Sequence, residues 1–279
     1  MIYQTKARIQ LNKEINTGYY LCVVKSNEIA KTALPGQFLN IRLTADGSPL
    51  LRRPFSIHKV NGRDLEVLYE VVGEGSRIFS QKKPGEYLDV IGPLGNGFSL
   101  PTTNDQPRLP LGTQGGQGPT TIIVAGGMGV APLLYLAEKL AYSLGHMAYS
   151  KPLVLIGAKT KNQLLCGKEF KALGCQVKIA TDDGSKGFKG RVTDLLKKIL
   201  PQAISHKPLA IYSCGPRPML KEICRISNQY DIPAQVSLEE HMACGFGACL
   251  GCAVNTIDGY KRVCKDGPVF EAANITWRE

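Results

Sequence analysis

The sequence predicts a β + α/β protein, with an N-terminal antiparallel β-barrel, a Rossmann-like parallel α/β domain and a small C-terminal module. Three observations support this prediction. Short apolar segments separated by turn residues fill residues 1–100, and apolar strands alternate with helical segments in residues 120–232. Four of the nine cysteines lie between Cys244 and Cys264. A chain of 279 residues is long enough to form two hydrophobic cores.

Residues 1–100 are expected to form the barrel. In the segment 65–71, apolar side chains occupy every second position, and Glu66 and Glu70 lie between them. This alternation is typical of strands with one buried face. Turn-forming residues recur at the spacing of an antiparallel barrel. They are Pro35-Gly36, Asp46-Gly47, Asn61-Gly62, Lys83-Pro84-Gly85 and Gly92-Pro93.

The segment 101–119 contains four prolines and four glycines, so it is predicted to be a linker or loop. Residues 120–232 are expected to form a parallel α/β sheet, because strands and helices alternate there. The expected strands are 121–125, 153–156, 176–179 and 209–212, and the expected helices are 131–144, 163–172, 191–200 and 217–228. Residues 233–279 remain for the small module.

Composition and charge restrict the class of protein. Hydrophobic residues make up 43% and charged residues 20%, as in a globular protein. No secretory signal is readable, and the most apolar stretch, 121–136, is interrupted by glycines and Pro132, so we expect a cytoplasmic protein without a transmembrane helix. Part of the net charge of +11 comes from residues 151–200, with eleven Lys/Arg against four Asp/Glu. Basic and aromatic residues are not interleaved there, so we expect no nucleic-acid partner.

The C-terminal cysteines predict an iron-sulfur cluster. Cys244, Cys249 and Cys252 form a C-x4-C-x2-C run, and Cys264 follows after eleven residues, which is plant-type 2Fe-2S spacing. Intervening glycines let the backbone wrap tightly and aim N–H groups at sulfur. A zinc site is the alternative, although zinc hairpins favour two C-x2-C units. A Rieske centre needs two histidines, and His241 is the only one near the loop.

Two loops of the α/β domain are candidates for binding a dinucleotide. Gly126, Gly127 and Gly129 follow a predicted strand and precede a helix, where a pyrophosphate meets the helix N-terminus. Cys214-Gly215-Pro216 also follows a predicted strand, so both loops would line one crevice. The alternatives are a purely structural glycine turn and, for Cys214, a buried small side chain.

A third pattern lies in the barrel. Arg53-Pro54-Phe55-Ser56 and Gly75-Ser76 supply a guanidinium group, backbone N–H groups and hydroxyl groups, all of which donate hydrogen bonds to phosphate oxygens. They predict a second pyrophosphate clamp. A surface arginine beside a hairpin is the alternative.

Along the chain, the arginine-serine stretch comes first, the glycine turn second and the Cys-Gly-Pro turn third. With this order of motifs, residues 7–238 resemble the ferredoxin-NADP reductase family of flavoproteins. The resemblance implies an FAD-binding barrel and an NAD-binding α/β domain, with Cys214 beside the nicotinamide as the catalytic residue. Phe55 stands where that family usually has tyrosine, so the hydrogen bond of the tyrosine hydroxyl is absent. The implied cofactor-binding residues are Arg53, Pro54, Phe55, Ser56, Leu68, Tyr69, Gly75, Ser76, Gly126, Gly127, Gly129, Gly215 and Pro216.

The C-terminal part looks more specifically like the electron-transfer subunits of class B dihydroorotate dehydrogenases. The similar segments are 181–185, 190–194, 237–245 and 263–270. This resemblance implies an FMN-containing catalytic subunit that oxidises dihydroorotate in pyrimidine biosynthesis, a heterotetramer with two copies of each subunit, and NAD as the electron acceptor. The segment 101–119 is longer than the family pattern.

These parts together predict a line of cofactors. A flavin exchanges electrons in pairs with nicotinamide, and a 2Fe-2S cluster passes them singly, so FAD is expected between the two. Without a third domain for an organic substrate, the cluster needs a separate protein as its electron partner. The alternatives are the same module serving a hydrogenase or a ferredoxin-NADP oxidoreductase, and a zinc-clipped module without enzymatic activity. Lys159 follows the second predicted strand of the α/β domain, where the 2′-phosphate of NADP could bind, so NADP stays an alternative acceptor. The resemblance favours NAD.

Overall fold

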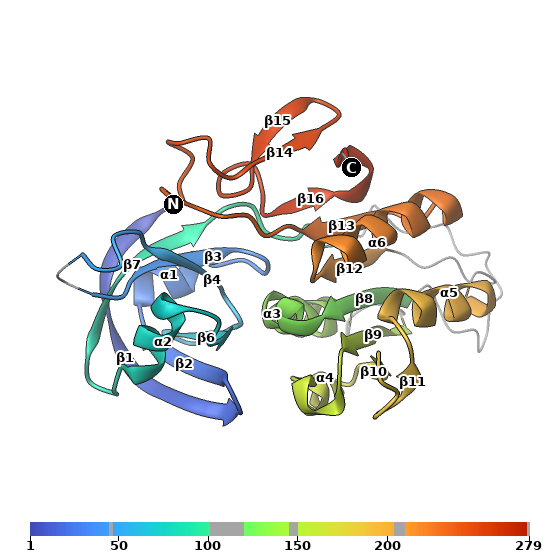
Figure 1. Ribbon diagram of the computed structural model, residues 1–279, viewed down its shortest axis with the longest axis horizontal. Helices are drawn as coiled ribbons and strands as arrows, with labels where there is room; N and C mark the ends of the chain where they lie inside the picture. Colours follow the sequence, from blue (N-terminus) through green and yellow to red (C-terminus); the bar gives the residue numbers. More distant parts are fainter. Residues whose placement is uncertain (45–46, 101–119, 145–149, 204–209, 278–279) are drawn as a thin grey trace.

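The computed structural model describes residues 1–44, 47–100, 120–144, 150–203 and 210–277. The chain forms a curved antiparallel sheet at one side, a sheet covered by helices at the other, and a small C-terminal module that lies over the junction (Figure 1). This is the fold class that the sequence predicts.

The N-terminal sheet has seven strands in the order β4-β3-β7-β1-β2-β6-β5, and all its pairs are antiparallel. In β6 the side chains of Leu65, Val67 and Tyr69 are buried, as their alternation predicts. Two short helices in this domain were not predicted. The elements are β1 (Tyr3–Asn16), β2 (Tyr19–Lys25), α1 (Asn27–Thr32), β3 (Phe38–Arg42), β4 (Arg53–Ser56), β5 (Lys59–Asn61), β6 (Asp64–Glu70), α2 (Glu74–Gln81) and β7 (Tyr87–Leu94).

The second sheet has the order β11-β10-β9-β8-β12-β13-β16, and only β16 runs antiparallel to its neighbour. Its strands are β8 (Thr120–Gly126), β9 (Ser150–Ala158), β10 (Gln176–Thr181), β11 (Phe188–Lys189), β12 (Ile211–Cys214), β13 (Ala234–Ser237) and β16 (Val269–Glu271). Its helices are α3 (Val130–Leu144), α4 (Gly167–Ala172), α5 (Val192–Ala203) and α6 (Arg217–Tyr230). The helix expected over 163–172 is shorter, because Cys166 at its start has a left-handed backbone with φ of 60°.

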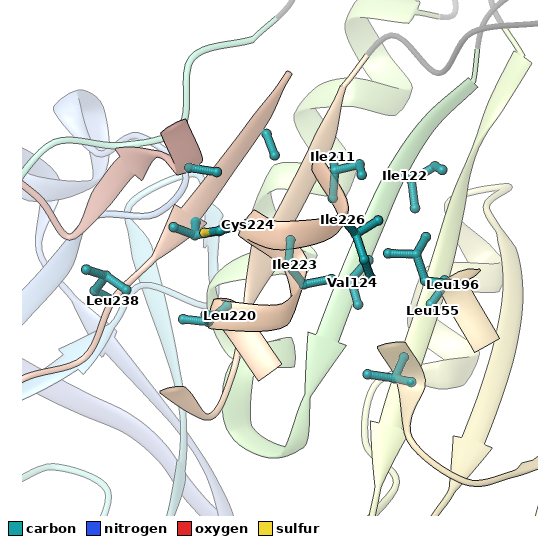
Figure 2. Packing of buried hydrophobic residues seen from close by; sticks show 14 of the residues in the cluster. Ile122, Val124, Leu155, Leu196, Ile211, Leu220, Ile223, Cys224, Ile226 and Leu238 are labelled. Atoms are coloured by element: carbon teal, nitrogen blue, oxygen red, sulfur yellow. The ribbon is translucent and has the colours of Figure 1, made fainter. Parts of the chain in front are cut away.

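Alternate residues of β8 face two different cores. Ile122 and Val124 pack with side chains of α5 and α6, as Figure 2 shows around Ile223. Ile123 and Ala125 face the other side, with side chains of α3 and α4. The strand is therefore apolar throughout, which is typical of a parallel sheet covered on both faces.

Helix α3 also fastens the two domains together. Tyr135 packs into the core of the N-terminal sheet, and its hydroxyl donates to the carbonyl of Ala33 at 3.1 Å. His58, at the start of the barrel hairpin, places its Nδ1 2.7 Å from the carbonyl of Ala131. Burial lowers the pKa of His58, so the ring is neutral and Nδ1–H donates.

The C-terminal module is a hairpin of β14 (Ala253–Thr256) and β15 (Gly259–Arg262), and β16 then joins the parallel sheet at β13. Cys252 and Cys264 pack into the same core as α6. The module thus depends on the α/β domain for part of its core.

Candidate functional site

A cavity of about 480 Å³ lies where the three parts of the chain meet. Barrel strand β4 contributes Pro54, Phe55 and Ser56, and β6 contributes Leu68 and Tyr69. The α/β domain contributes the start of α3, and residues 237–242 form the wall toward the cluster module. The volume and the mainly apolar lining are those of a cofactor pocket.

Aromatic side chains support the barrel side of this cavity. Tyr69 stacks on Phe79 with ring centroids 4.4 Å apart, and Phe55 contacts both rings. The Tyr69 hydroxyl donates to Asn12 at 3.0 Å, and burial raises the pKa of Tyr69 above its ordinary value. The side chain therefore remains a neutral phenol with a fixed orientation. The ring of Phe55 presents apolar surface to the cavity.

The predicted pyrophosphate clamp is brought together in space. A Cβ atom at Gly75 would lie 2.9 Å from Nε of Arg53, so the arginine lies closely across the start of α2, and a larger residue there would displace it. Nη1 of Arg53 donates to the carbonyl of Leu51 at 2.7 Å. The Ser76 hydroxyl accepts from the backbone N–H groups of Val72 and Gly73, so it caps its own helix instead of pointing outward. The guanidinium is the group of this set best suited to an external phosphate.

The two glycine-containing loops of the α/β domain touch. A Cβ at Gly129 would lie 2.0 Å from the carbonyl oxygen of Cys214, and one at Gly126 would lie 2.9 Å from Cδ of Pro216. Gly127 differs, because it has φ of +53° and no atom within 4 Å of a built Cβ. Gly126 and Gly129 thus serve close loop packing, whereas Gly127 faces open space at the start of α3, where a phosphate would fit.

Cys214 lies behind the cavity wall. It ends β12, is 1% exposed, and pairs with Ala125 on one side and with Ser237 on the other. Of these residues, Ser237 lines the cavity. Burial, reinforced by the charge of Glu239, raises the pKa of the Cys214 thiol well above its usual value. The thiol is therefore uncharged.

Glu239 lines the cavity but is not among the site residues that the sequence predicts. Desolvation by the surrounding protein raises the pKa of its carboxyl group. This carboxyl group therefore keeps its proton at a higher pH than an ordinary glutamate does. Two adjacent glutamates in a polar segment look like solvated surface, which is why the sequence did not single it out.

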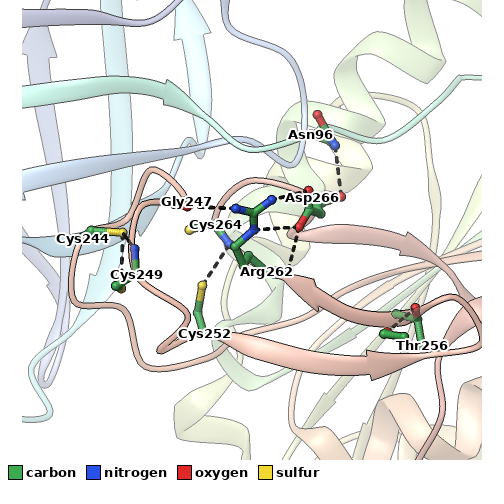
Figure 3. A network of polar contacts seen from close by, with 10 residues as sticks. Asn96, Cys244, Gly247, Cys249, Cys252, Thr256, Arg262, Cys264 and Asp266 are labelled. Carbon is green, nitrogen blue, oxygen red and sulfur yellow. Dashed lines mark hydrogen bonds and ion pairs between the residues drawn. The ribbon is translucent and has the colours of Figure 1, made fainter.

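The four predicted ligands form two pairs. Sγ of Cys249 lies 3.4 Å from Sγ of Cys244, and the backbone N–H of Cys264 lies 3.5 Å from Sγ of Cys252 (Figure 3). Among the described residues, no three potential ligands converge on a single point. A zinc ion needs four ligands around one centre, whereas a two-iron cluster takes two cysteines at each iron. The arrangement fits 2Fe-2S better than zinc.

The two cysteine pairs differ in environment. Cys252 and Cys264 are buried, and Cys244 and Cys249 are partly exposed. Partial burial opposes ionisation of Cys244, but N–H groups of Cys249 and Phe246 and the Cys249 thiol donate to its sulfur and lower its pKa to about 6. The rim of the site thus provides a thiolate at neutral pH, the form that binds iron.

Comparison with known proteins identifies the family. The model of the iron-sulfur cluster binding domain of dihydroorotate dehydrogenase B matches residues 239–276, and that of the oxidoreductase NAD-binding domain matches residues 123–225. The dihydroorotate dehydrogenase B (NAD(+)) electron transfer subunit of Desulforamulus reducens is 42% identical over 256 residues, which cover 90% of this chain and 89% of that protein. The chain belongs to this family of electron transfer subunits. It is therefore an oxidoreductase subunit.

Another dihydroorotate dehydrogenase B electron transfer subunit, from Caldanaerobacter subterraneus subsp. tengcongensis, is 37% identical over 279 residues and 99% of each chain. Among solved structures, an NADH-dependent reduced ferredoxin-NADP oxidoreductase studied for flavin-based electron bifurcation has a TM-score of 0.80 and 28% identity, covering 98% of this chain and 90% of that one. A ferredoxin NADP+ reductase from Neisseria gonorrhoeae with bound FAD and NADP shares the fold, with a TM-score of 0.64 and 18% identity over 81% of this chain and 91% of that one.

Proposed function

We propose that this chain passes electrons from an FMN-containing, dihydroorotate-oxidising partner subunit to NAD⁺, through a 2Fe-2S cluster and FAD, in pyrimidine biosynthesis. One observation carries the proposal: residues 237–242 line the interdomain cavity and lead directly into Cys244, the first of the paired cysteines. The cavity and the cysteine loop are thus consecutive in the chain. A flavin in the cavity would lie between the nicotinamide loops and the cluster.

In this proposal FAD occupies the cavity, and it supplies the exchange of electron pairs with nicotinamide. Leu68, Tyr69 and the β4 residues Pro54, Phe55 and Ser56 surround its ring system. Arg53, beside Gly75, donates to the pyrophosphate, and the Ser76 hydroxyl holds the first turn of α2 next to it.

NAD(H) is assigned to the edge of the parallel sheet where β8 and β12 end. Gly127 and the start of α3 receive its pyrophosphate, and Gly126, Gly129, Gly215 and Pro216 hold the two loops in contact. Cys214 then supports the wall against which the nicotinamide stacks.

Cys244, Cys249, Cys252 and Cys264 are assigned as the ligands of the cluster. Next to the partly exposed pair, Phe246 is 51% exposed and Leu250 is 73% exposed. Large apolar side chains on a cysteine loop are a suitable contact for a partner protein, because burying them on association is favourable. We assign the catalytic subunit to this face, in a heterotetramer of two copies of each subunit.

Among the described residues, no helix is long and apolar enough to cross a membrane. Two other features stay predictions. The cytoplasmic location and the domain boundaries at 100, 119 and 232 rest on the sequence, and the segment 101–119 lies outside the described residues.

The test is reconstitution with the partner. The chain is produced with and without a dihydroorotate-oxidising FMN subunit, and dihydroorotate-dependent reduction of NAD⁺ is followed in the purified complex. We expect a brown-yellow protein that reduces NAD⁺ only in the complex. The Cys252→Ala variant serves as control: without its cluster it should not couple dihydroorotate oxidation to the reduction of NAD⁺. A wild-type chain that carries flavin and cluster, yet never couples to such a subunit, would favour a hydrogenase or ferredoxin partner instead.

A further inference from the structure

A buried polar side chain in the barrel holds the cysteine loop. Asn40 lies in β3 between the buried residues Leu39 and Ile41, and it is itself 1% exposed. Its Nδ2 donates to the carbonyl of Cys244 at 3.0 Å. Its Oδ1 is buried without a hydrogen-bond partner among the described residues. Burying an unsatisfied amide oxygen is unfavourable, so an apolar residue would serve the barrel core better.

The loop is shaped to receive this amide. Gly245 has φ of +77°, and a Cβ built on it would lie 2.2 Å from Nδ2 of Asn40. Any other residue at this position would strain the backbone and push the loop away from the barrel. The side chain of Asn40 and the glycine after the first cysteine therefore fit each other.

Asn40 also adjoins the flavin side. In the ladder between β3 and β4 it pairs with Pro54, which lines the interdomain cavity. One side of the residue thus faces the cavity strand, and its amide holds the backbone of Cys244. The side chain of Asn40 therefore lies between Pro54 in the cavity wall and the backbone of Cys244.

A second carbonyl of the same loop is held from within the module. Nη1 of Arg262 donates to the carbonyl of Gly247 at 2.9 Å, and its Nε lies 3.1 Å from Oδ2 of Asp266 (Figure 3). Arg262 and Asp266 flank Cys264, so this bridge joins the turn of the fourth cysteine to the loop of the first two. It fixes the cysteines relative to one another, whereas Asn40 fixes the loop relative to the barrel.

We propose that Asn40 is the positioning residue that sets the distance between cluster and flavin, and thereby the rate of electron transfer between them. The inference rests on the proposed function, and it concerns the step inside this chain. Single-electron transfer slows steeply as two centres move apart, so a small displacement of the loop has a large effect on rate. A site held loosely by its surroundings keeps its ligands but loses its geometry.

The test uses the whole chain with its cofactors. Asn40→Leu keeps the approximate shape and removes the donor together with the unsatisfied oxygen, and Asn40→Asp keeps the shape and places a carboxylate against the Cys244 carbonyl. NADH is mixed with each protein under anaerobic conditions. NADH is oxidised to NAD⁺, its two electrons enter the flavin, and one electron at a time continues to the cluster. The reduction of flavin and cluster is followed by absorbance, and iron, sulfide and FAD contents are measured.

Both variants should keep wild-type iron, sulfide and FAD contents and the wild-type rate of flavin reduction. Cluster reduction should slow by about tenfold or more, and the EPR signal of the reduced cluster should shift. The Gly245→Ala variant disturbs the contact between Asn40 and the cysteine loop from the loop side, so it should also slow reduction of the cluster. Asn96→Leu is the matched control, because Nδ2 of Asn96 also joins the barrel side to the module, at the carbonyl of Asp266, without touching a cysteine.

A wild-type rate of cluster reduction in Asn40→Leu would overturn the proposal. So would loss of the cluster from Asn40→Leu and Gly245→Ala alike, since Asn40 would then be required for assembly and not for positioning. If the wild-type chain transfers electrons from NADH to its cluster but accepts none from a dihydroorotate-oxidising subunit, the proposed function fails while this inference stands.

Discussion

The interdomain cavity and the cysteine loop are built in different ways. The barrel side of the cavity is lined by residues of regular strands, β4 and β6, whose register fixes which side chains face inward. The loop from Cys244 to Cys252 contains no strand or helix, and two of its carbonyls are held by Asn40 and Arg262. One site is therefore shaped by the fold, and the other is shaped by a few side chains and by the metal it binds.

This difference has a thermodynamic consequence. A cavity on strands keeps its shape when empty, so removing one contact to its ligand costs the energy of that contact alone. A metal site that lacks regular secondary structure gains its order from ligation, so removing one ligand removes the whole site. Effects of substitution should be all-or-none at the cysteines and graded around the cavity.

The largest effect is expected at the four paired cysteines. Replacing Cys244, Cys249, Cys252 or Cys264 by alanine leaves one iron without its fourth ligand. Each variant should lose the visible absorption of the cluster and the EPR signal of its reduced state. Iron and sulfide analysis of the purified variants measures this directly.

Other cysteines provide the controls for this experiment. None of the control cysteines lies in the loop or its turn, so their alanine variants should keep the wild-type iron content. They are Cys22, Cys166, Cys175 and Cys224. A paired-cysteine variant with full iron and sulfide would show that this residue is not a ligand. It would also weaken the contrast between an all-or-none loop and a graded cavity.

The contrast also explains what the sequence could predict. Strand and helix positions of the α/β domain follow from hydrophobic periodicity, and those predictions are confirmed to within a few residues. The antiparallel addition of β16 to β13 was not predicted, because pairing between 235–237 and 269–271 depends on contacts far apart in the chain. Helix α2 was not predicted, because its eight residues begin within a Gly-Glu-Gly turn signal, at Glu74, and have a largely polar sequence.

Within the site, predictable residues were those whose chemistry repeats at a fixed spacing. The cysteine run and the two glycine turns have such spacing. Asn40 does not, and its one sequence signal is a polar residue between apolar neighbours in Phe38–Arg42. Its partner lies about two hundred positions away in the chain, at Cys244, so only the folded structure brings them together.

A smaller, graded effect is expected at the flavin pyrophosphate. Arg53→Ala removes a charge-assisted donor worth about 1.5 to 3 kcal/mol, which corresponds to a loss of FAD affinity of roughly tenfold to over a hundredfold. Flavin content after extensive dialysis, and titration of the apoprotein with FAD, measure the loss. Some flavin should still bind at high FAD concentration, because the cavity itself remains.

Arg52→Ala is the matched control for this prediction. Arg52 is the preceding residue, but its guanidinium is paired with Asp89 and donates to the carbonyl of that residue at 2.7 Å. Its replacement should lower stability without changing FAD affinity. Equal flavin loss in both variants would mean that the barrel had been disturbed, and undiminished flavin in Arg53→Ala would remove the arginine from the clamp.

The smallest effect is expected at Cys214, which lies behind the cavity wall. Cys214→Ala should slow reduction of the flavin by NADH by on the order of tenfold to a hundredfold, because the nicotinamide loses part of the surface that positions it. FAD content and the cluster spectrum should not change. Stopped-flow absorbance at saturating NADH measures the rate.

The raised pKa of Cys214 makes this prediction sharper. A thiol whose pKa lies well above its usual value stays protonated across about pH 6 to 9, so its removal should lower the rate without changing the shape of the pH profile. Cys224→Ala is the matched control, because Cys224 is also buried but lies on α6, away from the cavity. If Cys214 is only a packed side chain, both variants should lose stability equally and both should reduce flavin at the wild-type rate. In that case the glycine loops alone would position the nicotinamide.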